Sequence, residues 1–212
     1  FVNGIVKGFN CSFVGLQGTT GSNYSFESCK ISGDSNTTLS ADILEISRCN
    51  LTLNSSNTVT LQGVEELYYE GNRSSSGRFN FTTGSSTNII SNNRFNGLVR
   101  TVGTATQNLI TIVQGNNTEI VGNSFNASDS SSDTQVSKVL YFLGSGVVDA
   151  LNVVGNSFSL AHTGDSGAST WRSFDADNYS STGHNAIIEN NSIGLDFFQI
   201  KETTANQTFL SI

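Results

Sequence analysis

Apolar positions recur along the chain in a short pattern: an apolar residue, two residues, Asn or Cys, one residue, then a second apolar residue. Ile120-Val-Gly-Asn123-Ser-Phe125 is typical. Other full copies begin at Phe26, Ile46, Ile90, Val153 and Ile188, a partial copy is Cys11-Ser-Phe13, and a degenerate copy surrounds Asn72. The Asn or Cys falls at positions 11, 29, 49, 72, 93, 123, 156 and 191, which predicts eight repeats.

Each repeat contains short β-type runs such as NTVTLQG, NLITIV and VLYFLG, separated by Gly, Asn and Ser. Repeats of about 20 residues cannot bury an apolar face alone and must stack on one another. The chain also has no proline, as expected where every strand N–H donates to a neighbour. The pattern predicts an all-β fold: a single-stranded parallel β-helix, or solenoid, of about eight coils, with residues 1–212 as one domain.

Two inner features follow from stacking equivalent positions. The second apolar residue of each repeat should join one buried column, which would contain Phe13, Ile31, Leu51, Phe95, Phe125, Phe158 and Ile193. The Asn residues should form a ladder at one turn, because an amide both donates and accepts hydrogen bonds along a stack; the expected members are Asn93, Asn123, Asn156 and Asn191.

The V-x-G-N-S-F phrase at 153–158 and the E-N-N-S-I phrase at 189–193 resemble repeats of the right-handed, pectate-lyase-like parallel β-helix superfamily. This superfamily includes polysaccharide lyases, glycoside hydrolases, phage tailspikes and surface adhesins. The resemblance covers most of the chain at the level of the repeat and implies a right-handed solenoid. It says little about activity, because one fold serves many functions.

The repeats lengthen after about residue 96, which predicts loops at about 96–108, 126–138 and 159–184. The last of these segments contains the only tryptophan, Trp171, and both histidines, His162 and His184. We expect it to protrude and to present Trp171, Tyr179 and His162 to a glycan or another subunit, since exposed aromatic side chains need a cover.

Composition limits the partners. Asn, Ser, Thr and Gly make up 100 of the 212 residues, and the formal net charge is -7. The basic residues are scattered in sequence and predict no basic stripe, so we expect neither nucleic acid nor membrane insertion. The N-terminus has no charged leader and no long apolar run, and the chain has no methionine, which is typical of a processed chain or a fragment.

Cys11, Cys29 and Cys49 occupy the ladder position of the first three repeats. Three interpretations are open: a buried thiol ladder, one disulfide with a free thiol, or a metal site. The thiol ladder is favoured, because stacked parallel side chains rarely have disulfide geometry and no CxxC spacing is present.

Asn-x-Ser/Thr sequons number 12, about double the number expected from composition. Their positions make Asn10, Asn23, Asn36, Asn50, Asn54, Asn72, Asn80, Asn116, Asn126, Asn178, Asn190 and Asn206 glycosylation candidates. Ladder corners of the form Asn-x-Ser would raise the number without glycosylation.

Catalytic residues are not identified by motif. Asp175, Asp177 and His184 are weak candidates for a polysaccharide glycosidase, because such enzymes need paired carboxylates. The Asn-Thr-Asp, Asp-Asp and Arg-Ile-Lys motifs of polygalacturonases are missing, and the basic residues that lyases need are sparse. The sequence therefore favours a non-catalytic protein with no cofactor and no metal.

The preferred hypothesis is an extracellular structural or adhesive β-helix that associates with its own copies, through end-to-end stacking or as a trimer, and contacts carbohydrate. Strand-like sequence at both ends, with no capping helix, favours such association. The alternative is a tailspike-like receptor-binding protein on a virion surface, with polysaccharide binding or depolymerase activity.

Overall fold

The computed structural model describes residues 5–14, 22–33, 37–53, 58–83, 87–99, 108–113, 117–129, 137–143, 150–162, 171–179, 185–189, 191–193 and 198–202. These residues form 21 strands, and no helix occurs among them. Consequently, no helix of the described part is long and apolar enough to cross a membrane. The predicted all-β fold is confirmed.

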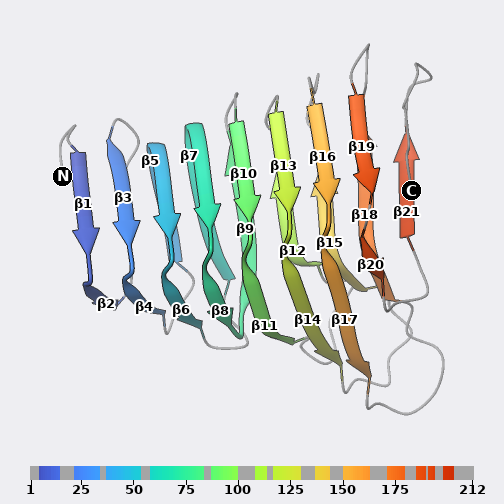
Figure 1. Cartoon of the computed structure of the whole chain (residues 1–212), viewed down its shortest axis with the longest axis horizontal. Helices are drawn as coiled ribbons and strands as arrows, with labels where there is room; N and C mark the ends of the chain where they lie inside the picture. The colour runs from blue at the N-terminus through green and yellow to red at the C-terminus, as the bar shows by residue number, and fades with distance from the viewer. Residues whose placement is uncertain are drawn as a thin grey trace.

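The strands belong to two sheets in which every pairing is parallel (Figure 1). The larger sheet has 13 strands: β1 (Ile5–Phe9), β3 (Asn23–Glu27), β5 (Thr37–Ser47), β7 (Thr58–Glu70), β9 (Arg78–Thr83), β10 (Thr87–Ser91), β12 (Asn108–Val113), β13 (Asn117–Val121), β15 (Ser137–Leu143), β16 (Ala150–Val154), β18 (Trp171–Tyr179), β19 (Asn185–Glu189) and β21 (Phe198–Glu202). The smaller sheet has eight: β2 (Ser12–Val14), β4 (Lys30–Gly33), β6 (Asn50–Leu53), β8 (Arg73–Ser75), β11 (Arg94–Val99), β14 (Ser124–Asp129), β17 (Ser157–His162) and β20 (Ser192–Ile193).

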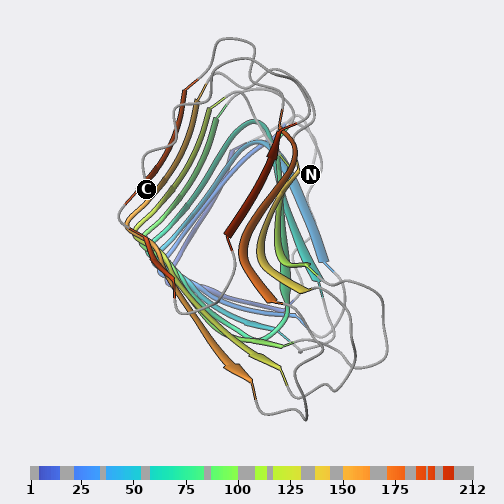
Figure 2. The same ribbon diagram turned by 90° about the vertical axis from the view of Figure 1, so that its right-hand side faces the viewer.

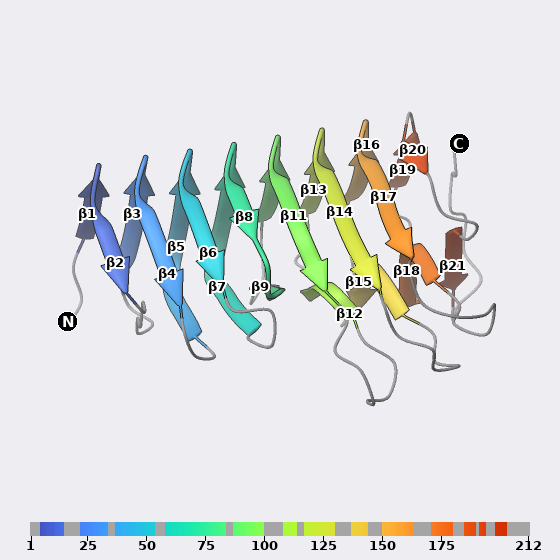
Figure 3. The same cartoon turned by 90° about the horizontal axis from the view of Figure 1, so that it is seen from below.

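The larger sheet has two wings that share the long strands β5 and β7. One wing runs β1-β3-β5-β7-β10-β13-β16-β19, and the other continues from β7 through β9, β12, β15, β18 and β21. Seen from the end, the two wings and the smaller sheet enclose the interior on three sides (Figure 2). Figure 3 shows the smaller sheet, with β2 at the N-terminal end and β20 at the other.

The bend of β7 depends on Gly63. The pairing of β5 with β7 shifts between Ala41 and Ile43, so that β7 carries an extra residue just after Gly63. A Cβ atom at Gly63 would lie 2.6 Å from the carbonyl carbon of Glu66, a distance that real Cβ atoms do not reach. Glycine is therefore required where the strand passes from one wing to the other.

Strand residues alternate between the interior and the surface. In β10 and β16 the second and fourth residues are buried and their neighbours are half-buried, which is the period of two expected for a strand with one covered face. Apart from local shifts such as the one after Ala41, the pairings are in register, so inward positions meet their equivalents in the neighbouring strands. We call such a row of paired residues a column.

The predicted apolar column is confirmed in its register. The pairings join Phe13 to Ile31, Ile31 to Leu51, Phe95 to Phe125, Phe125 to Phe158 and Phe158 to Ile193. Ile31, Leu51, Phe95, Phe125 and Phe158 are buried. The rings stack, with centroids 5.2 Å apart for Phe95 and Phe125 and 4.8 Å apart for Phe125 and Phe158.

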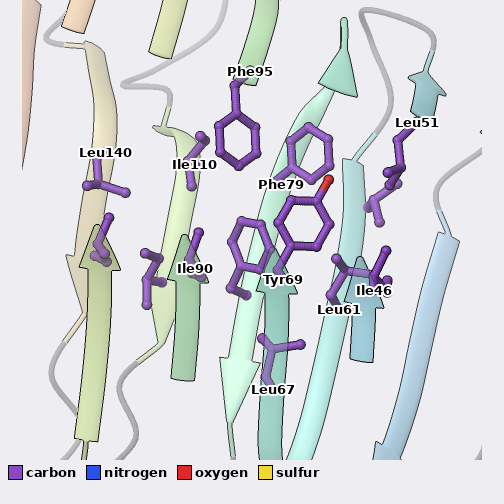
Figure 4. Packing of buried hydrophobic residues seen from close by; sticks show 14 of the residues in the cluster. Ile46, Leu51, Leu61, Leu67, Tyr69, Phe79, Ile90, Phe95, Ile110 and Leu140 are labelled. Carbon is purple, nitrogen blue, oxygen red and sulfur yellow. The ribbon is translucent and has the colours of Figure 1, made fainter. Parts of the chain in front are cut away.

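One member of this column was not predicted: Ser74 pairs with both Leu51 and Phe95. The space left by a serine is filled by Tyr69, which is buried and whose hydroxyl lies 2.6 Å from the hydroxyl of Ser74. Phe79, Phe81 and Phe95 surround the Tyr69 ring, with centroids 5.2 to 6.4 Å away. Figure 4 shows the Tyr69 ring together with Phe79 and Phe95. Large and small residues thus compensate each other at this point of the core.

The predicted loop boundaries need correction. Strand β11 continues to Val99, β14 to Asp129 and β17 to His162, so the first residues of all three predicted loops are strand. Strand β18 occupies Trp171–Tyr179, in the middle of the predicted loop 159–184. In this strand Phe174 is paired in register with Leu140 and Phe198.

Replacement of Phe125 by alanine should lower the free energy of unfolding by about 3–5 kcal/mol, since it removes a stacked ring and leaves a cavity. Urea unfolding followed by circular dichroism would measure the loss. Ser124→Ala is the matched control, because Ser124 is the preceding residue on the same strand and only half-buried. Similar stabilities for Phe125→Ala and Ser124→Ala would show that the column does not carry the core.

Candidate functional site

The candidate surfaces lie on either side of the corner that joins the first wing to the smaller sheet. The corner is made by a single residue in the left-handed backbone region, directly before each Asn or Cys of the repeat. The described corner residues are Asn10, Ser28, Arg48, Gly71, Asn92, Gly122 and Gly155, with φ between 52° and 66°. Glycine and asparagine tolerate this conformation best, whereas Ser28 and Arg48 adopt it at a cost in strain.

The Asn residues after these corners form the predicted amide ladder, which is confirmed and extends to Asn72. The Nδ2 of Asn93 donates to Oδ1 of Asn123 at 3.0 Å, and the Nδ2 of Asn123 donates to Oδ1 of Asn156 at 3.0 Å. Asn72 and Asn156 continue the ladder to Asn93 and Asn191 at 3.2 and 3.0 Å.

Each amide also satisfies the main chain of the preceding corner. Oδ1 of Asn123 accepts from the backbone N–H of Asn93 at 3.0 Å, and Nδ2 of Asn123 donates to the carbonyl of Ile90 at 2.8 Å. Both backbone groups lie where the chain turns from one sheet into the other. The amide therefore replaces the strand-to-strand hydrogen bonds that the turn interrupts, and it fixes the surface residues on both sides.

At the N-terminal end of the ladder, cysteine thiols take the place of the amides and bind the equivalent backbone groups. Sγ of Cys49 accepts from the backbone N–H of Cys29 at 3.2 Å and contacts the carbonyl oxygen of Phe26 at 3.5 Å. Cys29 and Cys49 are buried, Cys11 is half-buried, and all three are free. The thiol-ladder interpretation is thus confirmed, and the disulfide interpretation is wrong. Burial raises the pKa of the Cys49 thiol to about 11.

The smaller sheet exposes a basic column that was not predicted. Lys30, Asn50, Arg73 and Arg94 are paired in register on β4, β6, β8 and β11, and all four side chains are exposed. The expectation of scattered basic residues is therefore wrong for three of the ten. A signal was available in the sequence, because each of these residues directly follows the Asn or Cys of its repeat.

The first wing exposes an acidic column at the other side of the corner. Glu45, Tyr68, Ile89 and Glu119 are paired in register on β5, β7, β10 and β13. The hydroxyl of Tyr68 donates to Oε2 of Glu66 at 3.0 Å. Burial, the hydrogen bond to Glu66 and the nearby carboxylates raise the pKa of Tyr68, so its hydroxyl stays protonated and keeps donating in ordinary buffers.

The residues predicted as a contact or catalytic site lie mostly on strands. Trp171, Asp175, Asp177 and Tyr179 are on β18, where Asp175 pairs with Tyr141 and Gln199. His162 ends β17 and pairs with Asp129. The expected protruding loop is therefore wrong for Trp171 and Tyr179, and His184 lies outside the described residues.

Sequons fall in different environments. Asn10 and Asn50 are exposed, Asn23, Asn80 and Asn126 are half-buried, and Asn72 is buried in the ladder. The Asn126 amide donates to Oδ1 of Asn96 at 2.9 Å. Asn178 lies on β18, and the remaining candidates, Asn36, Asn54, Asn116, Asn190 and Asn206, lie outside the described residues.

Across the described ranges, no three His, Cys, Asp or Glu residues are grouped so that they could hold a metal ion. Comparison with protein-family models, with curated proteins and with solved structures finds no match to this chain. The features that bear on function are therefore the basic column, the acidic column and the corner that fixes both.

Asn123→Leu should cost about 1–3 kcal/mol of stability, because it leaves the N–H and amide of Asn93 and the carbonyl of Ile90 without their partner. Thermal or urea unfolding would measure the cost. Asn117→Leu is the control on the same repeat, since Asn117 is exposed on β13 and should change stability by no more than about 0.5 kcal/mol. An equal loss in both variants would contradict the ladder's role.

Iodoacetamide at pH 8 should alkylate Cys11 first and should reach Cys49 only when the protein unfolds. At that pH the raised pKa of Cys49 leaves little thiolate, and the side chain is also inaccessible. Mass spectrometry of peptides from native and urea-treated protein would check this order. Rapid labelling of Cys49 in the folded protein would contradict the thiol ladder.

Proposed function

We propose that the chain is a single-stranded parallel β-helix of about eight coils, right-handed as in the superfamily that its repeats resemble. From β1 to β8 successive strands alternate between the two sheets, and from β9 onward two strands of the larger sheet come between successive strands of the smaller one. Each strand pairs with the equivalent strand of the next repeat, as for β2, β4 and β6. Three fixed positions of the repeat supply the corner residue, the ladder residue and the column residue, and only Ser74 interrupts the apolar column among the described residues. A solenoid explains all three with one rule.

We infer that this solenoid is an extracellular structural or adhesive protein that associates with its own copies and carries N-linked glycans. The observation that carries the proposal is the continuity of the inner ladder from Cys29 to Asn191, which keeps the outer columns in fixed register over most of the chain. A rigid rod with regular faces suits support and adhesion. The polar surface and the excess of sequons suit a secreted protein.

The free thiols at the ladder do not argue against this location. Cys29 and Cys49 are both free and act as hydrogen-bonding members of a buried stack. Their burial protects them from oxidants, because thiol reactivity follows thiolate character and exposure. A secreted protein can therefore retain them in the reduced form.

Glycan attachment should follow exposure and not the sequon alone. Secretion from a eukaryotic host should give glycan at Asn10, which is exposed, and none at Asn72, whose amide is buried and donates to the carbonyl of Ile46. Site-resolved mass spectrometry with and without glycosidase would measure occupancy.

Asn72 is the matched control for Asn10, because both lie in sequons at equivalent corners, one residue apart in the repeat. Full occupancy at Asn72 would contradict the folded ladder. Bare asparagines at every exposed site, in protein from its native source, would overturn the glycoprotein proposal and favour the virion alternative.

A further inference from the structure

The basic column contains an unfavourable arrangement. Arg73 and Arg94 are directly paired across neighbouring strands, whose separation in a sheet is about 4.8 Å. Like charges in this position destabilise a sheet. Within the described ranges, Arg48 forms an ion pair with Glu27, and no described carboxylate forms one with Lys30, Arg73 or Arg94. The arrangement opposes folding, and an external partner of opposite charge would compensate it.

A matching set of charges lies on the acidic column. Glu45 and Glu119 are exposed and are separated by three strand steps, from β5 through β7 and β10 to β13. Lys30 and Arg94 are also separated by three steps, from β4 through β6 and β8 to β11. Both spans are therefore about 14 Å at the usual strand spacing.

The intermediate positions distinguish two orientations of a second copy. If the copies run antiparallel, Arg94 faces Glu45, Lys30 faces Glu119, and Arg73 faces Tyr68. If they run parallel, Arg73 faces Ile89 and gains nothing. A guanidinium over a tyrosine ring is attractive, and Glu66 beside Tyr68 adds a carboxylate, so the antiparallel arrangement is favoured.

We propose that the basic column of one molecule docks side by side on the acidic column of a second copy of this chain, in antiparallel orientation. This inference rests on the proposed self-association and gives it a surface. Each pair leaves one basic and one acidic column free, so the contact is heterologous and allows further copies to add.

Charge complementarity favours a second copy over a soluble polyanion. A polyanion would satisfy the basic column but would leave the equal spacing of Glu45 and Glu119 without meaning. The net charge of -7 repels copies at long range, so binding should need enough salt to screen that repulsion. Charges interact over a Debye length of about 10 Å at 0.1 M salt and about 3 Å at 1 M. The ion pairs at the contact should therefore hold at 0.1 M and weaken at 1 M.

The test is a charge exchange measured by sedimentation velocity. Wild-type protein should associate at 0.1 M salt and dissociate at 1 M. Arg73→Glu with Arg94→Glu, and separately Glu45→Lys with Glu119→Lys, should each weaken self-association at least about tenfold, because attraction becomes repulsion. An equimolar mixture of the two variants should associate again, since each then presents the charge that the other lacks.

Two controls separate the site from net charge and from misfolding. Ser157→Glu with Ser192→Glu adds two negative charges on the same column beyond the basic residues, half the net change of Arg73→Glu with Arg94→Glu, and should not weaken association. Arg94→Gln removes the charge without reversal and should weaken association partly. Circular dichroism identifies any variant that fails to fold, and the remaining variants then decide.

Unchanged association in both charge-reversed pairs, or a mixture that stays dissociated, would overturn the inference while leaving self-association through another surface intact. Wild-type protein that stays monomeric at 0.1 M salt would overturn both the inference and the self-association in the proposed function. Heparin binding by that monomer, lost in Arg73→Glu with Arg94→Glu, would assign the basic column to a polyanion instead.

Discussion

The hydrogen bonds of the ladder amide are the constraint on which this structure depends. A chain that turns sharply between two parallel sheets loses its strand-to-strand hydrogen bonds at the turn, and the buried N–H and carbonyl groups there must find other partners. In the repeats from Asn72 onward one asparagine supplies both, as Asn156 does for the N–H of Asn123 and the carbonyl of Ile120. Other residue types at this position must reproduce that pair of bonds or leave groups unsatisfied.

The core adapts to variation around this fixed corner. Where the repeat has Ser74 in place of a large apolar residue, the ring of Tyr69 on the adjoining wing fills the space. Its hydroxyl forms a hydrogen bond with the hydroxyl of Ser74. Where the repeat has cysteine in place of asparagine, the thiol reaches the same backbone groups at longer distances, 3.2 Å to the N–H and 3.5 Å to the carbonyl oxygen. Exchange is therefore tolerated inside the core when volume or hydrogen bonding is restored by a neighbour.

The fold class, the apolar column and the ladder were predictable because each depends on one residue type at a fixed place in the repeat. Strand β18 was not, because Trp171–Tyr179 alternates poorly and contains two Asp and one Asn. Its strand state is seen only in its pairing with β15 and β21, which come from distant segments.

The basic column was missed for a related reason. Lys30, Arg73 and Arg94 are far apart in sequence, and unequal repeat lengths hide the fact that they occupy one position. Aligning the repeats on their ladder residues would have shown it, because Lys30, Arg73 and Arg94 each directly follow the Asn or Cys of their repeat. The exposure of the Lys30, Arg73 and Arg94 side chains could be known only from the structure. The same is true of the pairing of Ser74 with Leu51 and Phe95.

The ladder also gives the molecule an electrical direction. Parallel sheets have little net dipole, because the backbone groups of a strand point alternately to both sides. The side-chain oxygens of Asn72, Asn93, Asn123 and Asn156 instead all accept from the residue of the preceding repeat, so their amide dipoles add along the stack. The two ends of the amide stack therefore differ in electrostatic potential. Hydrogen bonds aligned in this way also polarise and strengthen one another.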